Sequence, residues 1–344
     1  MVFTAELKKR TSLVAMSLAA LLLAGCSATS PAATAPPTSD AHPANYVTPR
    51  TMPEGKGSGA ADGVFPRTVV HFAGSTTLDA APKKVVVIST GQADALLTLG
   101  VVPTGSTSGD GADMIPSYLY TAFPDDKAAL DAVTYVGSRF EPNVETIANL
   151  APDLIVMSSA GKDATALYSS LSAIAPTVVT QGTGLYWKQD FLLLADAIGK
   201  TQQAAQWLDD YQGDAQAFGA TVKGAPTVSF LRKSADRTRV FGVASFSGSV
   251  AEDAGLARPE SQQFTDDTSV DISSEQLDQA DADFIFYGVQ GGDDTQLTSL
   301  PLWPTLAAVD NEHAVSVDDD VFYLNVGPTA ARGVLSQLEK TLGG

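Results

Sequence analysis

Three basic residues each follow a predicted buried strand. Arg139 lies in GSRFEPN (137–143), just after TYVG; Lys162 follows LIVMSSAG, and Arg232 follows TVSFL directly. In an open α/β sheet, ligands bind in the crevice beyond the carboxyl ends of the strands. If the three side chains converge on one cleft, they form an anion-binding floor, in which restricted water strengthens the attraction. Taken singly, each is equally well described as a solvated loop charge.

Aromatic side chains are available to complete such a pocket. Small-molecule sites are typically apolar clefts with a few placed polar groups. Trp303, flanked by leucines, is expected to pack in the core. The candidates for ligand contact are Tyr186, Trp187, Phe246 and Tyr323.

Catalytic constellations are mostly missing from the sequence. GSTSG (105–109) has threonine at its centre and does not match the nucleophile elbow, and there is no phosphate-binding loop motif. His42, His71 and His313 show no metal-ligand spacing, so a directly bound metal or other resident cofactor is not expected. The acidic run DDD (318–320) lacks the spacing of a calcium loop and is interpreted as solvated surface.

The charge balance restricts the partners. With 39 acidic residues against 21 Lys and Arg, the formal net charge is −18. A strongly acidic chain has no general affinity for nucleic acid or for anionic lipid surfaces. We therefore expect no nucleic-acid partner.

The first segment is typical of an exported protein. Basic residues 8–10 precede an apolar run, 13–24, that is too short to span a bilayer. Residues 1–25 are interpreted as a signal peptide ending in LAGC, whose Cys26 is the sole cysteine of the chain. This ending resembles the bacterial lipobox, which implies that Cys26 carries a lipid anchor.

The remaining chain divides into a linker and two α/β regions. Residues 26–67 are rich in Ala, Pro, Ser, Thr and Gly without an apolar period, so we expect a flexible tether. Strand-like runs then alternate with helical ones, which predicts an N-terminal α/β lobe over 68–182 and a C-terminal α/β lobe over 224–344. Residues 183–223 show only helical spacing, which predicts one long linking helix, with Gly199 and Gly213 as its possible breaks.

The two lobes share a short sequence pattern. ETIANLAPDLIV (145–156) and EQLDQADADFIF (275–286) both place an Asp eight residues after a Glu, at Asp153 and Asp283. Such repetition is typical of repeated structural units. The predicted fold is therefore two doubly wound lobes with mainly parallel sheets and a ligand cleft between them.

These segments together resemble the substrate-binding lipoproteins of ABC importers for iron complexes and cobalamin. The resemblance covers roughly residues 80–342, including VGSRFEPNVETIANLAPDLIV and RVFGVASFSGSVAEDAGLARP. It implies that Arg139 contacts the iron-chelating oxygens of a siderophore, and that Lys162 and Arg232 complete a basic triad. It further implies that Asp94 and Glu252, one on each lobe, dock onto arginines of the permease.

The leading hypothesis is a monomeric, lipid-anchored protein that binds a ferric siderophore and delivers it to an importer permease and its ATPase. The siderophore carries its own iron ligands, so no covalent chemistry is required, and a stiff helical joint predicts little lobe closure. Haem or cobalamin is the alternative ligand within the same class. An exported α/β hydrolase and a structural surface protein are alternatives of other classes.

Overall fold

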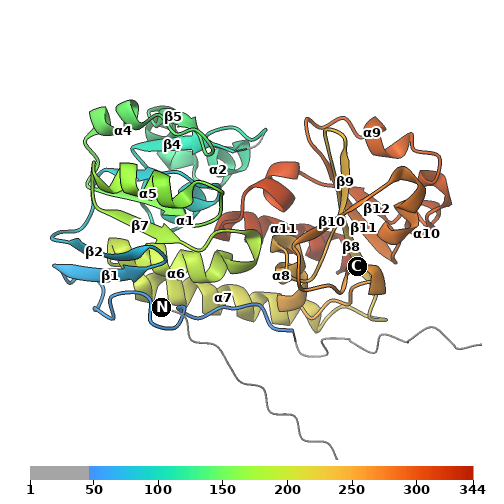
Figure 1. Ribbon diagram of the computed structural model, residues 1–344. Helices are drawn as coiled ribbons and strands as arrows, with labels where there is room; N and C mark the ends of the chain where they lie inside the picture. The colour runs from blue at the N-terminus through green and yellow to red at the C-terminus, as the bar shows by residue number, and fades with distance from the viewer. Residues whose placement is uncertain (1–45, 110, 344) are drawn as a thin grey trace, which may run out of the picture. The chain divides into compact units, whose positions relative to one another are not determined.

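The computed structural model describes residues 46–109 and 111–343, which contain two five-stranded sheets (Figure 1). The predicted signal peptide and Cys26 lie outside the described residues. Among those described, no helix is both long and apolar enough to cross a bilayer.

The sheet of the N-terminal lobe is parallel throughout, in the order β5-β4-β3-β6-β7. Its central strands are apolar and buried on both faces, as expected where helices cover a parallel sheet. The strands are β3 (Val85–Val87), β4 (Gly105–Ser108), β5 (Thr134–Ser138), β6 (Leu154–Ser158) and β7 (Thr177–Thr180). The helices are α1 (Gln92–Thr98), α2 (Ser117–Ala122), η1 (Pro124–Asp126), α3 (Lys127–Asp131), α4 (Val144–Leu150) and α5 (Ala164–Ser172).

The sheet of the C-terminal lobe has the equivalent order, β10-β9-β8-β11-β12, but is mixed. Strands β8, β11 and β12 are parallel, whereas β9 returns antiparallel to β8 and β10 is antiparallel to β9. The strands are β8 (Val228–Ser234), β9 (Arg237–Phe241), β10 (Ser269–Ile272), β11 (Phe284–Val289) and β12 (Ala314–Ser316). The helices are α8 (Phe246–Asp253), η3 (Glu260–Gln262), η4 (Ser274–Ala280), α9 (Thr295–Thr298), η5 (Trp303–Thr305), α10 (Ala307–Asp310), the π-helical η6 (Asp320–Leu324) and α11 (Pro328–Leu342).

The shared pattern of the two lobes has a structural counterpart. Asp153, before β6, accepts hydrogen bonds from the backbone N–H groups of Lys83 and Lys84 at the start of β3. Asp283, before β11, accepts one from the N–H of Thr227 at the start of β8. Each aspartate thus ties the start of its own strand to the parallel neighbour in the sheet.

The linking segment is not the single long helix that the sequence predicted. After the short η2 (Gly184–Tyr186) come two helices, α6 (Trp187–Ile198) and α7 (Thr201–Gly219). Gly199 ends α6 in the left-handed conformation, with φ of 75°, whereas Gly213 lies inside α7 without interrupting it. In Figure 1 the two helices lie along one side of both lobes, and their apolar residues join one core cluster with residues of each lobe.

The prediction of a flexible tether up to residue 67 is wrong for residues 46–66. Ser58 donates hydrogen bonds from its N–H and hydroxyl to Asp196 of α6, and the N–H of Gly63 donates to the carbonyl of Gly199. The segment then enters a two-stranded hairpin, β1 (Arg67–His71) and β2 (Gly74–Leu78), that the sequence did not reveal. Polar contacts, including those with the buried side chain of Asp196, hold this segment in place. The sequence therefore shows no hydrophobic periodicity from which its ordered structure could be predicted.

Candidate functional site

A cavity of about 480 Å³ is lined by residues of both lobes and of α6. The N-terminal lobe contributes residues at or after the ends of all five strands, β3 to β7, as expected for the carboxyl ends of parallel strands. The C-terminal lobe contributes the β8–β9 hairpin and the segment around η6. The lining is rich in small polar side chains and contains four arginines: Arg139, Arg232, Arg237 and Arg239.

The turn that carries Arg139 explains the pattern of GSRFEPN. Gly137 has φ of 96°, and a Cβ there would lie 2.6 Å from the carbonyl oxygen of Glu141, so the turn requires glycine. Asn143 caps α4 by accepting a hydrogen bond from the N–H of Thr146. Between these two structural residues, the Arg139 guanidinium lies 4.4 Å from the ring centroid of Phe140.

Arg232 lies at the end of β8 and is largely buried. Its Nε and Nη2 atoms donate to the two carboxylate oxygens of Asp319, at 2.6 and 2.7 Å. This two-point pairing is the geometry in which a guanidinium fork binds a carboxylate most strongly. Arg139 and Arg232, both predicted as site residues, line the same cavity.

Arg237 and Arg239 were not predicted as site residues. Both lie on β9, which begins at Arg237 and runs antiparallel to β8. The alternation R-x-R-x-F over 237–241 is the signal that could have found them, because alternate residues of a strand share one face. Arg237 pairs with Asp271 at the surface, and Arg239 Nη2 donates to Ser234 Oγ at 3.2 Å.

The predicted role of Lys162 is not supported by its position. Ala160 lines the cavity, but Lys162 is exposed and is not among the lining residues. Gly161 between them has φ of 140°, a backbone conformation that favours glycine. The basic triad expected from the resemblance thus lacks its lysine and has Arg237 and Arg239 in addition.

The four predicted aromatic contacts divide evenly. Trp187 and Tyr323 line the cavity, although Trp187 is only 2% exposed and its Nε1 donates to Ser249. Phe246 is buried against the Trp187 ring, and Tyr186 is half-buried; neither is in the lining. Phe246 is therefore a core residue. Trp303, which was predicted to pack in the core, is buried as well.

The predicted docking role of Asp94 is wrong. Asp94 is 1% exposed and accepts hydrogen bonds from the N–H groups of Thr329 and Ala330 at the start of α11. A carboxylate buried in this way cannot meet a partner at the surface. Glu252 is half-buried, and its carboxylate accepts a hydrogen bond from the N–H of Thr48.

The charged residues of the described lining are the four arginines and one acidic residue, Asp190. Burial is the main cause that lowers the pKa of Arg239, and the neighbouring Arg232 and Arg237 lower it further. Asp190 of α6 also lines the cavity, and burial raises its pKa to about 6 although it accepts hydrogen bonds from the N–H groups of Gln181 and Gly182. Within the described residues, no group of three or more His, Cys, Asp or Glu is arranged to hold a metal ion.

The chain matches known proteins over most of its length. Residues 85–321 match the family model described as periplasmic binding protein. The probable siderophore-binding lipoprotein YfiY of Bacillus subtilis is 32% identical over 284 residues, which cover 77% of this chain and 84% of YfiY. The Fe(3+)-citrate-binding protein YfmC of the same species is 26% identical, covering 82% of this chain and 89% of YfmC. Among solved structures, SirA of Staphylococcus aureus complexed with staphyloferrin B is 27% identical with a TM-score of 0.69, covering 80% of this chain and 98% of SirA.

Proposed function

Because the chain belongs to the periplasmic binding protein family, we propose that it captures a ferric siderophore outside the cytoplasm and delivers it to the permease of an ABC importer. Its family is one of substrate-binding proteins, and we propose no catalytic activity for it. The iron would arrive already chelated, so the protein would need no resident metal or cofactor.

One observation carries this proposal: arginines from both lobes line a single cavity. Arg139 comes from the N-terminal lobe, and Arg232, Arg237 and Arg239 come from the C-terminal lobe. Guanidinium groups donate charge-assisted hydrogen bonds to anionic oxygens, which a ferric siderophore presents around its metal. Binding from two sides would hold the complex between the lobes.

The remaining features of the proposal concern the partners. We propose that a lipid on Cys26 retains a monomeric protein at the outer face of the membrane, and that the permease works with its ATPase. Glu252 is the remaining candidate for permease docking, since Asp94 is buried. The core shared by α6, α7 and both lobes supports little lobe closure.

The alternatives have no comparable support. Among the described residues that line the cavity there is no histidine that could serve as an axial ligand of haem. The match to a binding-protein family likewise gives no support to a hydrolase.

Titration of the purified protein with ferric siderophores tests the proposal. Ligand entry should quench tryptophan fluorescence, because Trp187 lines the cavity. Arg139→Ala should weaken binding at least about tenfold, since charge-assisted hydrogen bonds contribute roughly 1.5–3 kcal/mol, whereas Lys162→Ala, which also removes one positive charge, should not. Absence of binding by ferric hydroxamate, catecholate and carboxylate complexes at micromolar concentration would overturn the proposal.

A further inference from the structure

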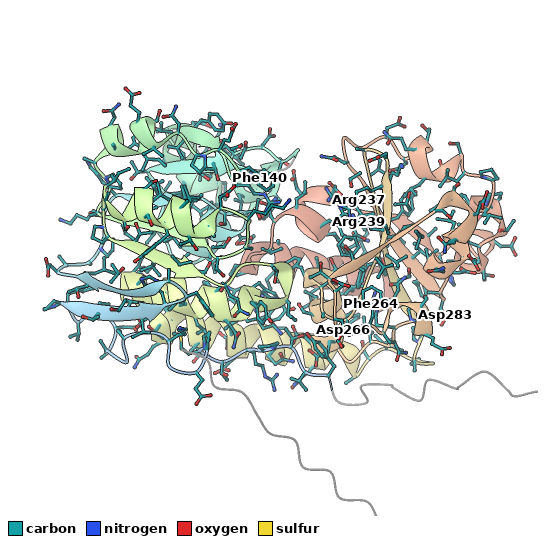
Figure 2. The ribbon with its side chains drawn as sticks, in the orientation of Figure 1. Phe140, Arg237, Arg239, Phe264, Asp266 and Asp283 are labelled. Atoms are coloured by element: carbon teal, nitrogen blue, oxygen red, sulfur yellow. The ribbon has the colours of Figure 1, made fainter. Side chains whose placement is uncertain are left out.

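The C-terminal side of the cavity carries three arginines on one face of the β8–β9 hairpin. Arg232 on β8 lies directly opposite Arg239 on β9, and Arg237 is two residues from Arg239, so it shares that face. Figure 2 shows Arg237 and Arg239 on the side of this lobe that faces Phe140 of the other lobe. Like charges placed directly opposite each other destabilise a sheet unless they are neutralised.

The protein neutralises this face only in part. Asp319 pairs with Arg232 in the interior, where the two side chains are 12% exposed or less. The Arg237–Asp271 pair is more than half exposed, and such surface pairs contribute little and exchange readily. Arg239 forms no salt bridge with any carboxylate in the described part of the chain, and its buried Nε has no hydrogen-bond partner there. The face therefore retains positive charge directed at the cavity.

The other lining residues indicate what kind of anion fits. The aromatic members of the described lining are Trp187, Phe191 and Tyr323. Trp187 and Phe191 are 2% and 1% exposed, and the Tyr323 ring packs 4.9 Å from Phe241 with its hydroxyl bonded to the carbonyl of Phe286. These rings offer little open face for stacking an aryl group.

The remaining walls suit hydroxyl and carboxylate groups. Ser89, Thr90, Ser158, Thr180 and Ser234 are among the lining residues. Moreover, Arg232 already binds a carboxylate by the two-point geometry on this face. A carboxylate of a ligand could pair with Arg239 in the same manner.

The following inference rests on the proposed function. We infer that the bound ferric complex is polyanionic with carboxylates at its periphery, and that Arg237 and Arg239 are the residues that select for these carboxylates. Arg139 would meet the complex from the opposite lobe. A neutral or cationic complex would leave the charge of the hairpin uncompensated, and a complex covered by aryl rings would meet polar walls.

The test compares three ferric probes by fluorescence quenching and calorimetry: ferric citrate, the trihydroxamate ferrioxamine, and the tricatecholate ferric enterobactin, whose aryl groups carry no free carboxylate. We expect ferric citrate to bind at least about tenfold more tightly than either other probe, with an affinity that falls as salt is raised because charge attraction is screened. Arg239→Gln and Arg237→Gln should each weaken ferric citrate binding, the former at least about tenfold, as expected for a lost charge-assisted bond.

Lys233→Gln is the matched control. Lys233 lies on the same hairpin but pairs with Thr238 on the other face, and it is not in the lining. It should change the affinity by less than about twofold. Arg239→Lys keeps the charge but loses the planar fork, so an intermediate loss is expected. Thermal unfolding of each variant identifies any that fail to fold. If Arg239→Gln fails to fold, the affinity of Arg237→Gln for ferric citrate decides the test, because Arg237 is exposed.

The outcomes separate the inference from the proposed function. If ferrioxamine binds as tightly as ferric citrate, or ferric enterobactin binds best, the inference is overturned while the proposed function stands. Equal losses in Lys233→Gln and Arg239→Gln would overturn the assignment to the two arginines. If no ferric complex binds, both fail.

Discussion

The Asp94 carboxylate caps a helix that belongs to the other lobe: its Oδ1 accepts a hydrogen bond of 2.8 Å from the N–H of Thr329, near the start of α11. Oδ2 accepts bonds from the N–H of Ala330 and the hydroxyl of Tyr118, both at 2.9 Å. The helix has no capping side chain of its own, and a Cβ at Gly327 would clash with Asp94. The N-terminal lobe thus supplies the cap that stabilises α11.

Replacement of Asp94 by alanine should therefore destabilise the protein. Loss of the cap leaves buried N–H groups without acceptors, which typically costs about 1–3 kcal/mol. Urea unfolding measures the change, with Asp125→Ala on the exposed surface as the control. If stability were unchanged and only uptake through the permease fell, the docking role predicted from the sequence would be right after all.

A buried ion pair between α6 and α8 leads to a second prediction. Lys188 Nζ lies 2.5 Å from Asp253 Oδ1, and both side chains are 2% exposed or less. Lys188→Met should lower the free energy of unfolding by about 3–5 kcal/mol, because it leaves an uncompensated buried carboxylate. The double variant Lys188→Met with Asp253→Leu should recover much of that loss in the same unfolding experiment. A double variant as unstable as the single one would contradict this explanation.

His71 makes stability depend on pH. Its Nδ1 accepts a hydrogen bond from the N–H of Ala73, so its Nε2 carries the proton and donates to Thr76. Burial, together with the smaller effect of nearby Lys56, lowers the pKa of His71 from 6.5 to about 4.

The sign of this dependence follows from linkage. Between about pH 6.5 and pH 4 the unfolded chain binds a proton at this position that the folded protein does not, so the free energy of unfolding should fall as the pH falls through this window. Urea unfolding at several pH values measures the slope. His71→Gln, which cannot titrate, should show a shallower slope, and an identical slope would refute the assignment.

Asp190 should make anion binding depend on pH. With its pKa raised to about 6, its carboxylate is negative at pH 7.5 and mostly neutral at pH 5. Because this group lines the cavity, an anionic ferric complex should bind more tightly as the pH falls between these values. Affinities measured across this range with a complex whose own charge is constant test the effect. Asp190→Asn should flatten the profile; a profile of unchanged steepness would assign the effect to another group, such as Asp320, whose pKa burial also raises to about 6.

Local patterns predicted the part of the site that lies at parallel strand ends. Arg139 directly follows the edge strand β5 and Arg232 lies near the end of the buried strand β8, and the α/β alternation indicated that these strand ends meet at one cleft. What escaped prediction depends on non-local contacts. Asp94 has the spacing of a helix-surface residue and is buried only because α11 returns to it, and residues 46–66 are fixed by polar groups of α6 far along the chain. The reversal of β9 likewise has no counterpart in the parallel N-terminal sheet.

Because β9 returns antiparallel to β8, the two halves of the cavity are built from different numbers of chain segments. The N-terminal half draws its lining from segments at the ends of all five strands of its sheet, so its shape depends on the whole lobe. The C-terminal half places three arginines within the eight residues 232–239, on one hairpin. Exchange of that short stretch could therefore re-specify the ligand charge without altering the scaffold, which makes the hairpin a compact module for the divergence of binding preference.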